Sequence, residues 1–336
     1  MQVCIYTGGS SLVGKSGVGQ AIIHQKKALE KNGVTVCSRL HTESEIVHIN
    51  TVLPDSLWAV WAARRAGKKI IYYAHSTMED FKKSFKGSDL LAPLFKRWII
   101  FCYQKGDVII TPTDYSKKLL ESYGIQQPIY ALSNGVDTDL FATAAEKDDS
   151  FWEKFGIEKG KKVVISVGHL IERKGIMEYI ELAKTMENVE FLWLGDTGSP
   201  LIPKKIAKAI HSAPKNLHFL GYVEQNMLCE IYAQADAFVF LSKEETEGIV
   251  VLEALSSGTP TILWDIPAYR EWLQDGKNVY KVKTMSEAKK KLEKLLQGSL
   301  PDLTEEGRQV AKARNLSAIG KELIKIYQGY HFSSTK

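Results

Sequence analysis

Residues 237–260, AFVFLSKEETEGIVVLEALSSGTP, contain a complete strand, loop and helix pattern. The apolar run AFVFLS is typical of a buried strand, and the polar, acidic run KEETEG after it is typical of a loop. Gly248 stands before a helical pattern that Gly258 and Pro260 close. The stretch therefore predicts one strand–loop–helix unit of an α/β domain, in which ligands bind where strands run into loops.

The same rhythm runs through both halves of the chain. In the first half, strand patterns lie at 2–7, 46–50, 68–76, 107–113 and 129–135, with helical patterns at 18–31, 54–66, 92–105 and 114–123. In the second half, helical patterns follow strand patterns at 162–168, 189–195, 217–222, 237–242, 261–265 and 278–282. These strand patterns are continuous apolar runs, as in parallel strands buried on both faces. The sequence predicts an α/β protein with two Rossmann-like, doubly wound domains that face each other across a cleft.

The expected domain boundaries follow from a polar segment, 138–160, that lacks a long apolar run. With this segment as the linker, the N-terminal domain spans 1–140 and the C-terminal domain spans 141–315. An amphipathic helix at 316–336 is expected to cross back and brace the first domain. A chain of 336 residues also exceeds the size at which a single hydrophobic core stops growing, which favours two domains.

Composition and charge exclude several classes of protein. The chain is 44% apolar and 25% charged, as in soluble globular proteins. Its apolar run from Trp98 to Tyr103 is far shorter than the ~20 residues of a membrane-spanning helix, and no secretory signal is visible at the N-terminus. Four scattered cysteines without a C-x-x-C pair argue against zinc and against a disulfide framework. Residues 60–120 hold 12 Lys or Arg against five Asp or Glu, within a net charge of +5, which suggests an anionic partner.

The stretch GGSSLVGKSG near the N-terminus matches the P-loop pattern through Gly9, Gly14, Lys15 and Ser16. In a P-loop the Lys-Ser pair opens the helix, whereas here glycines follow at once, and each would cost the first turn about 1 kcal/mol. No clean run of four apolar residues ends in an aspartate that could hold magnesium. We expect instead that GKSGVG forms a flexible loop whose bare backbone at Gly17 lets a bulky ligand approach. A P-loop ATPase is the alternative from a different class of protein.

The carboxylates of the opening stretch flank the start of its helix. Glu245 lies in the loop before Gly248, and Glu253 lies about one turn inside the helix. The backbone N–H groups of Gly248, Ile249 and Val250 have no partner within the helix and can hold a phosphate. One carboxylate can accept hydrogen bonds from a sugar, and the other from a ribose. The alternative is that both glutamates are solvated surface charges.

These residues carry a family resemblance that covers nearly the whole chain. EETEGIVVLEALSSGTP resembles the glutamate-x7-glutamate segment of retaining, nucleotide-sugar-dependent glycosyltransferases of the GT-B fold. LSNGVDTDLF resembles the segment that closes their first domain, and SVGHLIERKGI resembles the donor-phosphate segment that opens their second. KSGVGQAIIHQKKAL and AHSTMEDFKKSFKGSDLLAPLFKRW are similar to the bacterial enzymes that add a second sugar to monoglucosyl-diacylglycerol.

The resemblance implies a role for each matching residue. Glu245 would bind the hydroxyls of the donor sugar, and Glu253 would bind the ribose. The amides of 248–250 would contact the sugar and the diphosphate. Lys174 would place a cation on the diphosphate, where negative charge grows as the nucleotide departs. His75, at the end of the strand pattern KKIIYYAH, would lie near the reacting sugar carbon and help to orient the donor.

The sequence also departs from the family pattern. Arg usually follows the glycine of VGHL, where this chain has His169, so Arg173 is the candidate for the second phosphate clamp. No carboxylate on the first domain is an obvious nucleophile, which implies front-face retention, with the leaving phosphate taking the proton of the acceptor. The DTD at 137–139 is similar to a metal-binding Asp-x-Asp, but the family is independent of metal, and we expect a turn there and neither metal nor cofactor.

A basic and apolar segment of the first domain is the candidate contact with the membrane and the acceptor. In FKKSFKGSDLLAPLFKRWIIFCY, basic residues alternate with aromatic residues and leucines, as in surfaces that lie among lipid headgroups. The alternative is a core helix whose solvated face is basic, and no nucleic-acid recognition motif is present. The expected contact residues are Lys82, Lys83, Phe85, Lys86, Lys96, Arg97 and Trp98.

The sequence as a whole predicts a hexosyltransferase on the cytoplasmic face of the cell membrane. It would move glucose or galactose from UDP-glucose or UDP-galactose to glucosyl-diacylglycerol and so make a diglycosyl-diacylglycerol. The alternative within the same fold is a transferase that acts on a polysaccharide or soluble acceptor.

Overall fold

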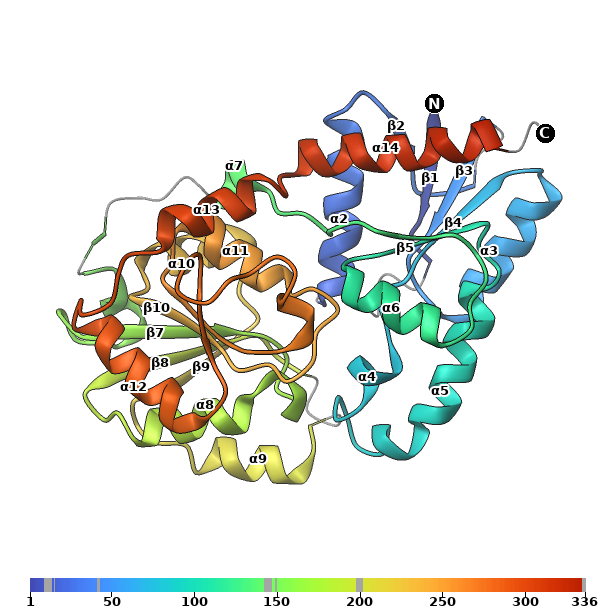
Figure 1. Cartoon of the computed structure of the whole chain (residues 1–336). Helices are drawn as coiled ribbons and strands as arrows, with labels where there is room; N and C mark the ends of the chain where they lie inside the picture. The colour runs from blue at the N-terminus through green and yellow to red at the C-terminus, as the bar shows by residue number, and fades with distance from the viewer. Residues whose placement is uncertain are drawn as a thin grey trace.

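The computed structural model describes residues 1–8, 14, 16–40, 43–141, 147–148, 150–197 and 202–333, with side chains as far as residue 329. It contains two six-stranded parallel sheets, one in each half of the chain. Figure 1 shows the two α/β units beside each other, the N-terminal one on the right. The predicted fold class, two Rossmann-like domains, is confirmed.

The N-terminal sheet has the strand order β2-β1-β3-β4-β5-β6. Its strands are Gln2–Tyr6 (β1), Thr35–Cys37 (β2), Ile46–Ile49 (β3), Lys69–Tyr73 (β4), Val108–Thr111 (β5) and Ile129–Ala131 (β6). Its helices are Gly17–Glu30 (α2), Pro54–Arg65 (α3), Met78–Phe81 (α4), Ser88–Tyr103 (α5) and Asp114–Ser122 (α6). Side chains of β1 alternate between the two faces: Cys4 packs in the core with α3 and α5, whereas Val3 and Ile5 pack in the core with α2.

The C-terminal sheet has the strand order β12-β11-β10-β7-β8-β9. Its strands are Lys162–Val167 (β7), Val189–Leu194 (β8), Leu217–Gly221 (β9), Ala237–Phe240 (β10), Thr261–Trp264 (β11) and Tyr280–Val282 (β12). One face is covered by Gln225–Gln234 (α10), Ile249–Ser257 (α11) and Thr304–Lys312 (α13). The other is covered by Ile176–Lys184 (α8), Lys204–His211 (α9) and Met285–Leu296 (α12).

Two stretches of backbone pass side by side between the domains. The N–H of Val136 donates to the carbonyl of Arg314 at 3.0 Å, and Val136 also forms a parallel bridge with Asn315. The helix Thr138–Phe141 (α7) follows the first crossing, and Leu316–Ser333 (α14) follows the second. The described parts of the polar segment 138–160 pack on the C-terminal domain through Phe141, Trp152 and Ile157, which lie in its core.

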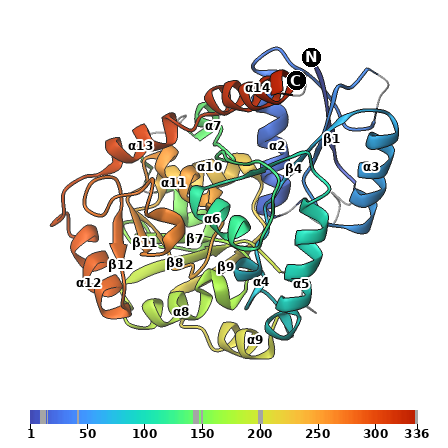
Figure 2. The same ribbon diagram turned by 45° about the vertical axis from the view of Figure 1, so that its right-hand side comes forward.

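Helix α14 returns to the N-terminal domain, where Figures 1 and 2 show it lying across the end of α2. Leu323 and Tyr327 are buried in the core between α2 and the sheet. The hydroxyl of Tyr327 is 2.8 Å from Nδ1 of His48 on β3. The last helix therefore joins the two domains a second time, and both crossings leave the strand ends of the two sheets facing one another.

One helix boundary differs from the sequence expectation. The pattern predicts a helix from residue 92, close to Pro93, a residue common in first turns. Helix α5 instead begins at Ser88, after Gly87 in the left-handed region at φ 85°, and Pro93 lies inside it. Ser88 and Ala92 are buried, so packing of this extra turn outweighs the hydrogen bond that Pro93 cannot donate.

Candidate active site

The loop after β10 and the loop after β7 meet at Glu245. Its Oε1 accepts a hydrogen bond from Nζ of Lys174 at 2.5 Å and from the hydroxyl of Ser242 at 2.6 Å. Glu245 is buried, and Lys174 lies in the short 3-10 turn Glu172–Lys174 just before α8. The structure thus joins two residues, 71 positions apart in the chain, that the sequence assigns to the donor sugar and its diphosphate.

Neighbouring charges determine the ionisation state of Glu245 and Lys174. Burial alone would raise the pKa of the Glu245 carboxyl, but Lys174 and Arg173, together with the hydrogen bonds from Lys174 and Ser242, hold it below its ordinary value. Burial lowers the pKa of the Lys174 ammonium, an effect that Glu245 opposes. Glu245 is therefore an anion whose charge the protein's own cations balance.

Arg173, the second candidate for the phosphate, reaches toward the N-terminal domain. Its Nη1 is 2.8 Å from Oδ1 of Asp80 on α4 and donates to the carbonyl of Glu244 at 2.7 Å. His169 is placed differently, because its Nδ1 is 2.7 Å from the backbone carbonyl of Asp196, and burial lowers its pKa. Oxygens of the protein thus engage Nη1 of Arg173 and Nδ1 of His169.

The start of α11 lies where the sequence predicts it. Gly248 caps the helix in the left-handed region, at φ 94°, and α11 begins at Ile249. Gly248, Ile249 and Val250 are half-buried, and their amides are at the helix end that favours an anion. A Cβ on Gly248 would lie 3.2 Å from the hydroxyl of Tyr269, so the backbone needs glycine here for its φ angle and for this close approach.

Glu253 lies in the interior of the domain, in the second turn of α11. It is 4% exposed, and the hydroxyl of Tyr232 on α10 donates to its Oε2 at 3.2 Å. Burial raises the pKa of this carboxyl to about 7, which the bond from Tyr232 offsets only in part. The alternative that both glutamates are solvated surface charges is therefore wrong.

The loop 241–248 also contacts the N-terminal domain along its length. The hydroxyl of Thr113 donates to the carbonyl of Thr246 at 2.8 Å, and the hydroxyl of Tyr115 donates to Glu244 at 2.7 Å. Oε2 of the buried Glu247 accepts from both the backbone and the side-chain nitrogen of Asn134, at 2.9 and 2.8 Å. The sequence analysis missed these contacts. The acidic run KEETEG was a signal for them, since three acids in one loop are rarely all solvated when the loop faces a second domain.

His75 follows the end of β4 and is buried on the N-terminal side. Its Nε2 is 2.9 Å from the side-chain oxygen of Asn50, which follows β3, and its ring stacks on Tyr73 with centroids 4.5 Å apart. Burial lowers the pKa of His75 to about 3. The imidazole is therefore neutral at physiological pH, as an orienting group can be.

The glycine-rich N-terminal segment is described only in part. Gly9 and Lys15 of the P-loop pattern lie outside the described residues. Helix α2 begins at Gly17, capped by the hydroxyl of Ser16, so the expected loop GKSGVG ends earlier than predicted and its last three residues are helical. A Cβ on Gly17 would meet nothing within 4 Å, which leaves open space beside the residue assigned to the donor.

The DTD segment forms ion pairs with α2. Asp137 lies 3.0 Å from Nζ of Lys27, and Asp139 lies 2.7 Å from Nζ of Lys31. Within the described part of the chain, no group of three or more His, Cys, Asp or Glu is arranged to hold a metal ion. The two aspartates hold α7 against the N-terminal domain.

The expected membrane contact residues divide into two groups. Lys82, Lys83, Lys86 and Arg97 are exposed. The other three are half-buried. The Phe85 ring packs edge-on against Phe81 with centroids 4.8 Å apart, Nζ of Lys96 lies 4.2 Å from the centroid of the Tyr123 ring, and the indole of Trp98 donates to the carbonyl of Val52 at 2.7 Å.

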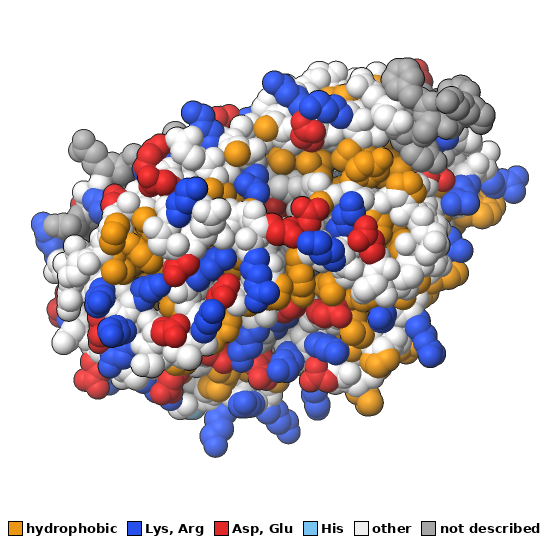
Figure 3. Space-filling model, in the orientation of Figure 1, with side chains coloured by type: hydrophobic (Ala, Val, Ile, Leu, Met, Phe, Trp, Pro, Cys, Tyr) orange, Lys and Arg blue, Asp and Glu red, His pale blue; other side chains and the backbone are white. Residues whose placement is uncertain are grey.

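Large apolar side chains are exposed on α3 and α5 instead. Leu90 is 86% exposed and Leu94 65%, on α5, while Trp58 is 63% exposed and Trp61 55%, on α3. Both helices pack on the same face of the N-terminal sheet, and Figure 2 shows them on the same side of that domain. The sequence analysis missed the tryptophans, although their spacing of three residues places them on one helix face. Figure 3 shows Lys and Arg side chains gathered along the lower edge of the molecule, with hydrophobic side chains beside them.

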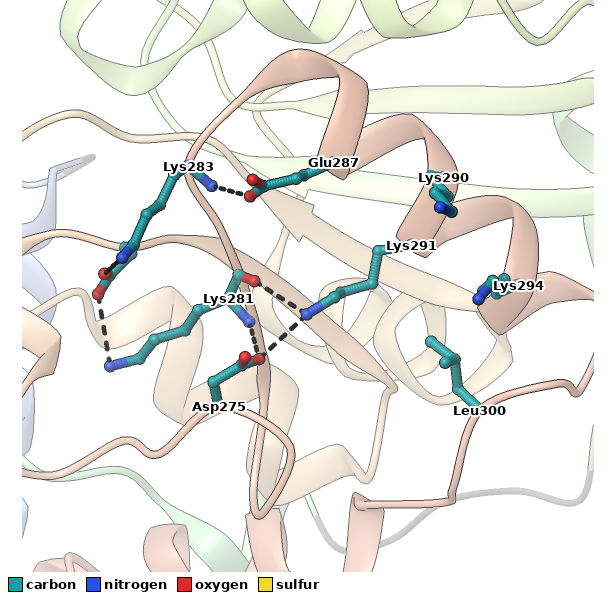
Figure 4. Close-up of a pocket in the computed structure, with 9 residues that line it drawn as sticks. Asp275, Lys281, Lys283, Glu287, Lys290, Lys291, Lys294 and Leu300 are labelled. Atoms are coloured by element: carbon teal, nitrogen blue, oxygen red, sulfur yellow. Dashed lines mark hydrogen bonds and ion pairs between the residues drawn. The ribbon is translucent and has the colours of Figure 1, made fainter.

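A separate cavity of about 500 Å³ lies in the C-terminal domain between β12 and α12. Figure 4 shows that several of its polar groups contact one another: Nζ of Lys291 is 3.2 Å from Asp275, and the backbone N–H of Lys283 donates to Glu287 at 2.8 Å. None of the residues that line it belongs to the cluster around Glu245. The cavity therefore has no place in the candidate active site.

Comparison with known families identifies the class. Residues 147–314 match the family Glycosyl transferases group 1, and residues 38–140 match Glycosyltransferase Family 4. Anabaena HepE in complex with UDP-glucose has the same fold, with a TM-score of 0.78 over 98% of this chain and 100% of that chain at 16% identity. Together with the two facing parallel sheets, these matches define a GT-B glycosyltransferase.

Curated relatives narrow the class. The chain is 40% identical to a processive diacylglycerol alpha-glucosyltransferase of Acholeplasma laidlawii, over 91% of each chain. It is 25% identical to an alpha-galactosylglucosyldiacylglycerol synthase of Streptococcus pneumoniae, over 78% of this chain and 71% of the relative. The chain belongs to the glycolipid-synthase family of GT-B glycosyltransferases, as its resemblance predicts. Among the described residues, no helix has the length and apolar character needed to cross a bilayer.

Proposed function

We propose that this protein is a retaining, membrane-peripheral glycosyltransferase that moves glucose or galactose from a UDP-sugar to monoglucosyl-diacylglycerol. The observation that carries the proposal is the contact of the half-buried Lys174 with the buried Glu245, beside the start of α11. It supplies a cation, a carboxylate and backbone N–H groups at one place. The names of the relatives, an alpha-glucosyltransferase of diacylglycerol and a galactosylglucosyldiacylglycerol synthase, support the donor sugar and the acceptor.

Each group of the site has a task in this reaction. Lys174 leaves Glu245 and binds the diphosphate, where it stabilises the charge that grows on the departing UDP. Glu245, released from Lys174, accepts hydrogen bonds from hydroxyls of the sugar. The amides of 248–250 bind the sugar and phosphate at the positive end of α11. Glu253 accepts from the ribose.

The acceptor hydroxyl attacks from the face that the leaving group vacates. The bond from the anomeric carbon to the UDP oxygen breaks, the bond to the acceptor oxygen forms, and the leaving phosphate takes the acceptor proton. The neutral His75 orients the donor, because Asn50 fixes its Nε2 and Tyr73 fixes its ring plane. We propose that no metal takes part, and activity that survives chelation of divalent cations with EDTA is the expected result.

The surface of the N-terminal domain supports a membrane acceptor. Exposed leucines on α5 follow the exposed cations Lys82, Lys83 and Lys86 in the chain, and α3, on the same face of the sheet, carries exposed tryptophans. Apolar side chains that enter the headgroup layer and cations that meet anionic lipid act together, each cation contributing about 1 kcal/mol. We propose that this face rests on the cytoplasmic side of the membrane.

A product analysis tests the reaction. The protein is incubated with radiolabelled UDP-glucose and UDP-galactose and with glycolipid or soluble acceptors, and the products are separated by chromatography. A labelled diglycosyl-diacylglycerol is expected from the wild type and none from Lys174→Ala. Lys243→Ala is the matched control, because that lysine lies in the same loop region but pairs with Glu178 at 2.6 Å. Full turnover by Lys174→Ala would refute its role, and label only in a polysaccharide or soluble product would replace the lipid acceptor.

Flotation tests the membrane face. The wild type is expected to float with vesicles that contain anionic phosphatidylglycerol at low salt, and less so as salt screens the cations. Leu90→Ser with Leu94→Ser should reduce flotation at every salt concentration. A protein that ignores anionic vesicles at low salt has no such face.

A further inference from the structure

Arg173 is the point at which the donor loops meet the segment that holds α4 and α5. Besides the contact with Asp80, its Nε donates to the hydroxyl of Ser84 at 3.2 Å, so two residues of the N-terminal domain hold one guanidinium. The Arg173 side chain is 10% exposed and that of Asp80 is 23% exposed. An arginine–carboxylate pair so shielded from water is strong and fixes geometry.

The backbone of Arg173 is held just as firmly by the donor loop. The N–H of Lys243 donates to its carbonyl at 2.8 Å, and the hydroxyl of Ser242 donates to the same oxygen at 3.3 Å. Its Nη1 also lies 3.7 Å from Oε1 of Glu245. A continuous set of contacts therefore runs from Asp80 through Arg173 to Ser242 and Glu245.

The contacts of Arg173 favour a holding role over a role in binding phosphate. Nη1 and Nε are both engaged by protein oxygens, whereas the ion pair of Lys174 among the described residues is with Glu245 alone. The charges of Arg173 and Lys174 balance those of Asp80 and Glu245. If Arg173 moved away to bind a phosphate, the carboxylate of Asp80 would be left in the cleft without its cation.

We propose that Asp80 is a positioning residue for sugar transfer: through Arg173 it fixes the loop that carries Glu245 against the acceptor side of the cleft. The inference rests on the proposed function and deepens it, because it explains how the N-terminal domain aligns an acceptor hydroxyl with the donor. Small misplacements of reacting groups are enough to slow a transfer strongly.

The test compares neighbouring residues of α4. Asp80→Asn keeps the shape and removes the charge that meets Arg173. Glu79→Gln is the matched control, because Glu79 accepts a hydrogen bond from Tyr123 within its own domain. With monoglucosyl-diacylglycerol in anionic vesicles, Asp80→Asn is expected to lower kcat at least about tenfold. The KM for the UDP-sugar and the Kd for UDP should change less than about twofold, and Glu79→Gln should behave as the wild type.

The ratio of UDP-sugar hydrolysis to sugar transfer distinguishes a loss of acceptor alignment from general damage to the enzyme. If Asp80 aligns the acceptor, its loss should raise the ratio of UDP-sugar hydrolysis by water to transfer, since water needs no alignment across the cleft. In a double-mutant cycle, adding Asp80→Asn to Arg173→Gln should cost nothing further in kcat, because both act through one contact.

Two results would overturn the inference. One is a weaker Kd for UDP in Arg173→Gln with full kcat in Asp80→Asn, which would make Arg173 a phosphate clamp. The other is additive losses in the cycle. Neither affects the proposed function, which fails only if the wild-type protein transfers no sugar from a UDP-sugar to the lipid.

Discussion

The loop 241–248 and the helix α11 that follows it each bury one glutamate of the same pair, in opposite electrostatic surroundings. Glu245 is surrounded by Lys174, Arg173 and the hydroxyl of Ser242, and its pKa is held low. Glu253 has, among the described residues, one hydrogen bond, from Tyr232, and burial raises its pKa to about 7. The two glutamates therefore differ: Glu245 is an anion balanced by nearby cations, whereas ionisation of Glu253 destabilises the folded protein.

The difference indicates how each carboxylate meets a ligand. Under the proposed function, a donor takes Lys174 and Glu245 apart, and its diphosphate and sugar replace the lost pair. Glu253 has no cation beside it among the described residues, so hydroxyls of a ribose would stabilise its buried carboxylate. Binding of the proposed donor would therefore exchange contacts at the loop and add them at the helix.

The largest expected effect comes from Glu245→Gln. It removes the charge that balances a buried lysine and should lower the free energy of unfolding by about 3 kcal/mol, as loss of one partner of a buried ion pair does. Transfer should fall by at least about 10²-fold, since the sugar contact and the placement of Lys174 are lost together. Chemical denaturation and single-turnover transfer measure the two effects.

The pH dependence of this loss follows from the sign of the pKa shift. Because the folded pKa of Glu245 lies below its unfolded value, its stabilising contribution is present above the unfolded pKa and disappears as pH falls through the folded one. The variant should therefore differ from the wild type at pH 7 and converge with it in acid. Equal stability of the two at pH 7 would contradict the pairing.

An intermediate effect of opposite sign is expected from Glu253→Gln. The folded pKa of about 7 lies above the unfolded value, so ionisation costs the fold on the order of 3 kcal/mol once pH exceeds 7. The amide is neutral at every pH, so the variant should be more stable than the wild type at pH 8 and gain nothing at pH 4. Thermal unfolding at both values measures this.

The affinity for UDP tests whether Glu253 also binds the ribose. If its carboxylate binds the ribose, UDP should bind Glu253→Gln about tenfold more weakly, because the ligand loses a hydrogen bond to a charged group. Calorimetric titration with UDP measures it. A variant that gains stability at pH 8 and keeps full UDP affinity would confine Glu253 to the interior of the domain.

The sequence determines the fold more fully than the site. Continuous apolar runs locate the strands, because parallel strands buried on both faces leave this pattern, and Gly248 marks the start of α11 because only glycine suits its φ angle. The partners of Glu245 were predictable only as members of one family motif. Their contact depends on how β7 and β10 pair in the sheet, which is a property of the folded chain.

Contacts across the cleft escape sequence reasoning for a physical reason. Asp80 stands inside a stretch rich in Lys and Phe, and its composition indicates a lipid-facing segment. Its partner Arg173 lies in the other domain, and no local periodicity connects them. The inward turn of Trp98 and the exposure of Trp58 likewise depend on which helix faces pack against the sheet, which the apolar pattern of α5 leaves ambiguous.

The smallest expected effect concerns the hydrogen bond to Glu253 on α11. Tyr232→Phe removes the hydroxyl that donates to Glu253 and keeps the ring, which packs edge-on against Phe141 and Phe238. The same hydroxyl lies 3.1 Å from the carbonyl of Val250, so it is shared between two buried acceptors. Its loss should lower the free energy of unfolding by about 1 kcal/mol. Because protonated Glu253 can itself donate, the loss should be largest above pH 7, where the carboxylate most needs a donor.

Tyr179→Phe is the matched control for this last change. Its hydroxyl donates to the carbonyls of Val164 and Leu192 on the opposite face of the same sheet, far in the fold from either glutamate. Both variants lose one buried hydroxyl, but only Tyr232→Phe should lose stability in a pH-dependent way. If denaturation curves of the two variants shift equally at pH 5 and pH 8, the hydroxyl of Tyr232 contributes nothing specific to Glu253, and burial alone sets the high pKa of that carboxyl.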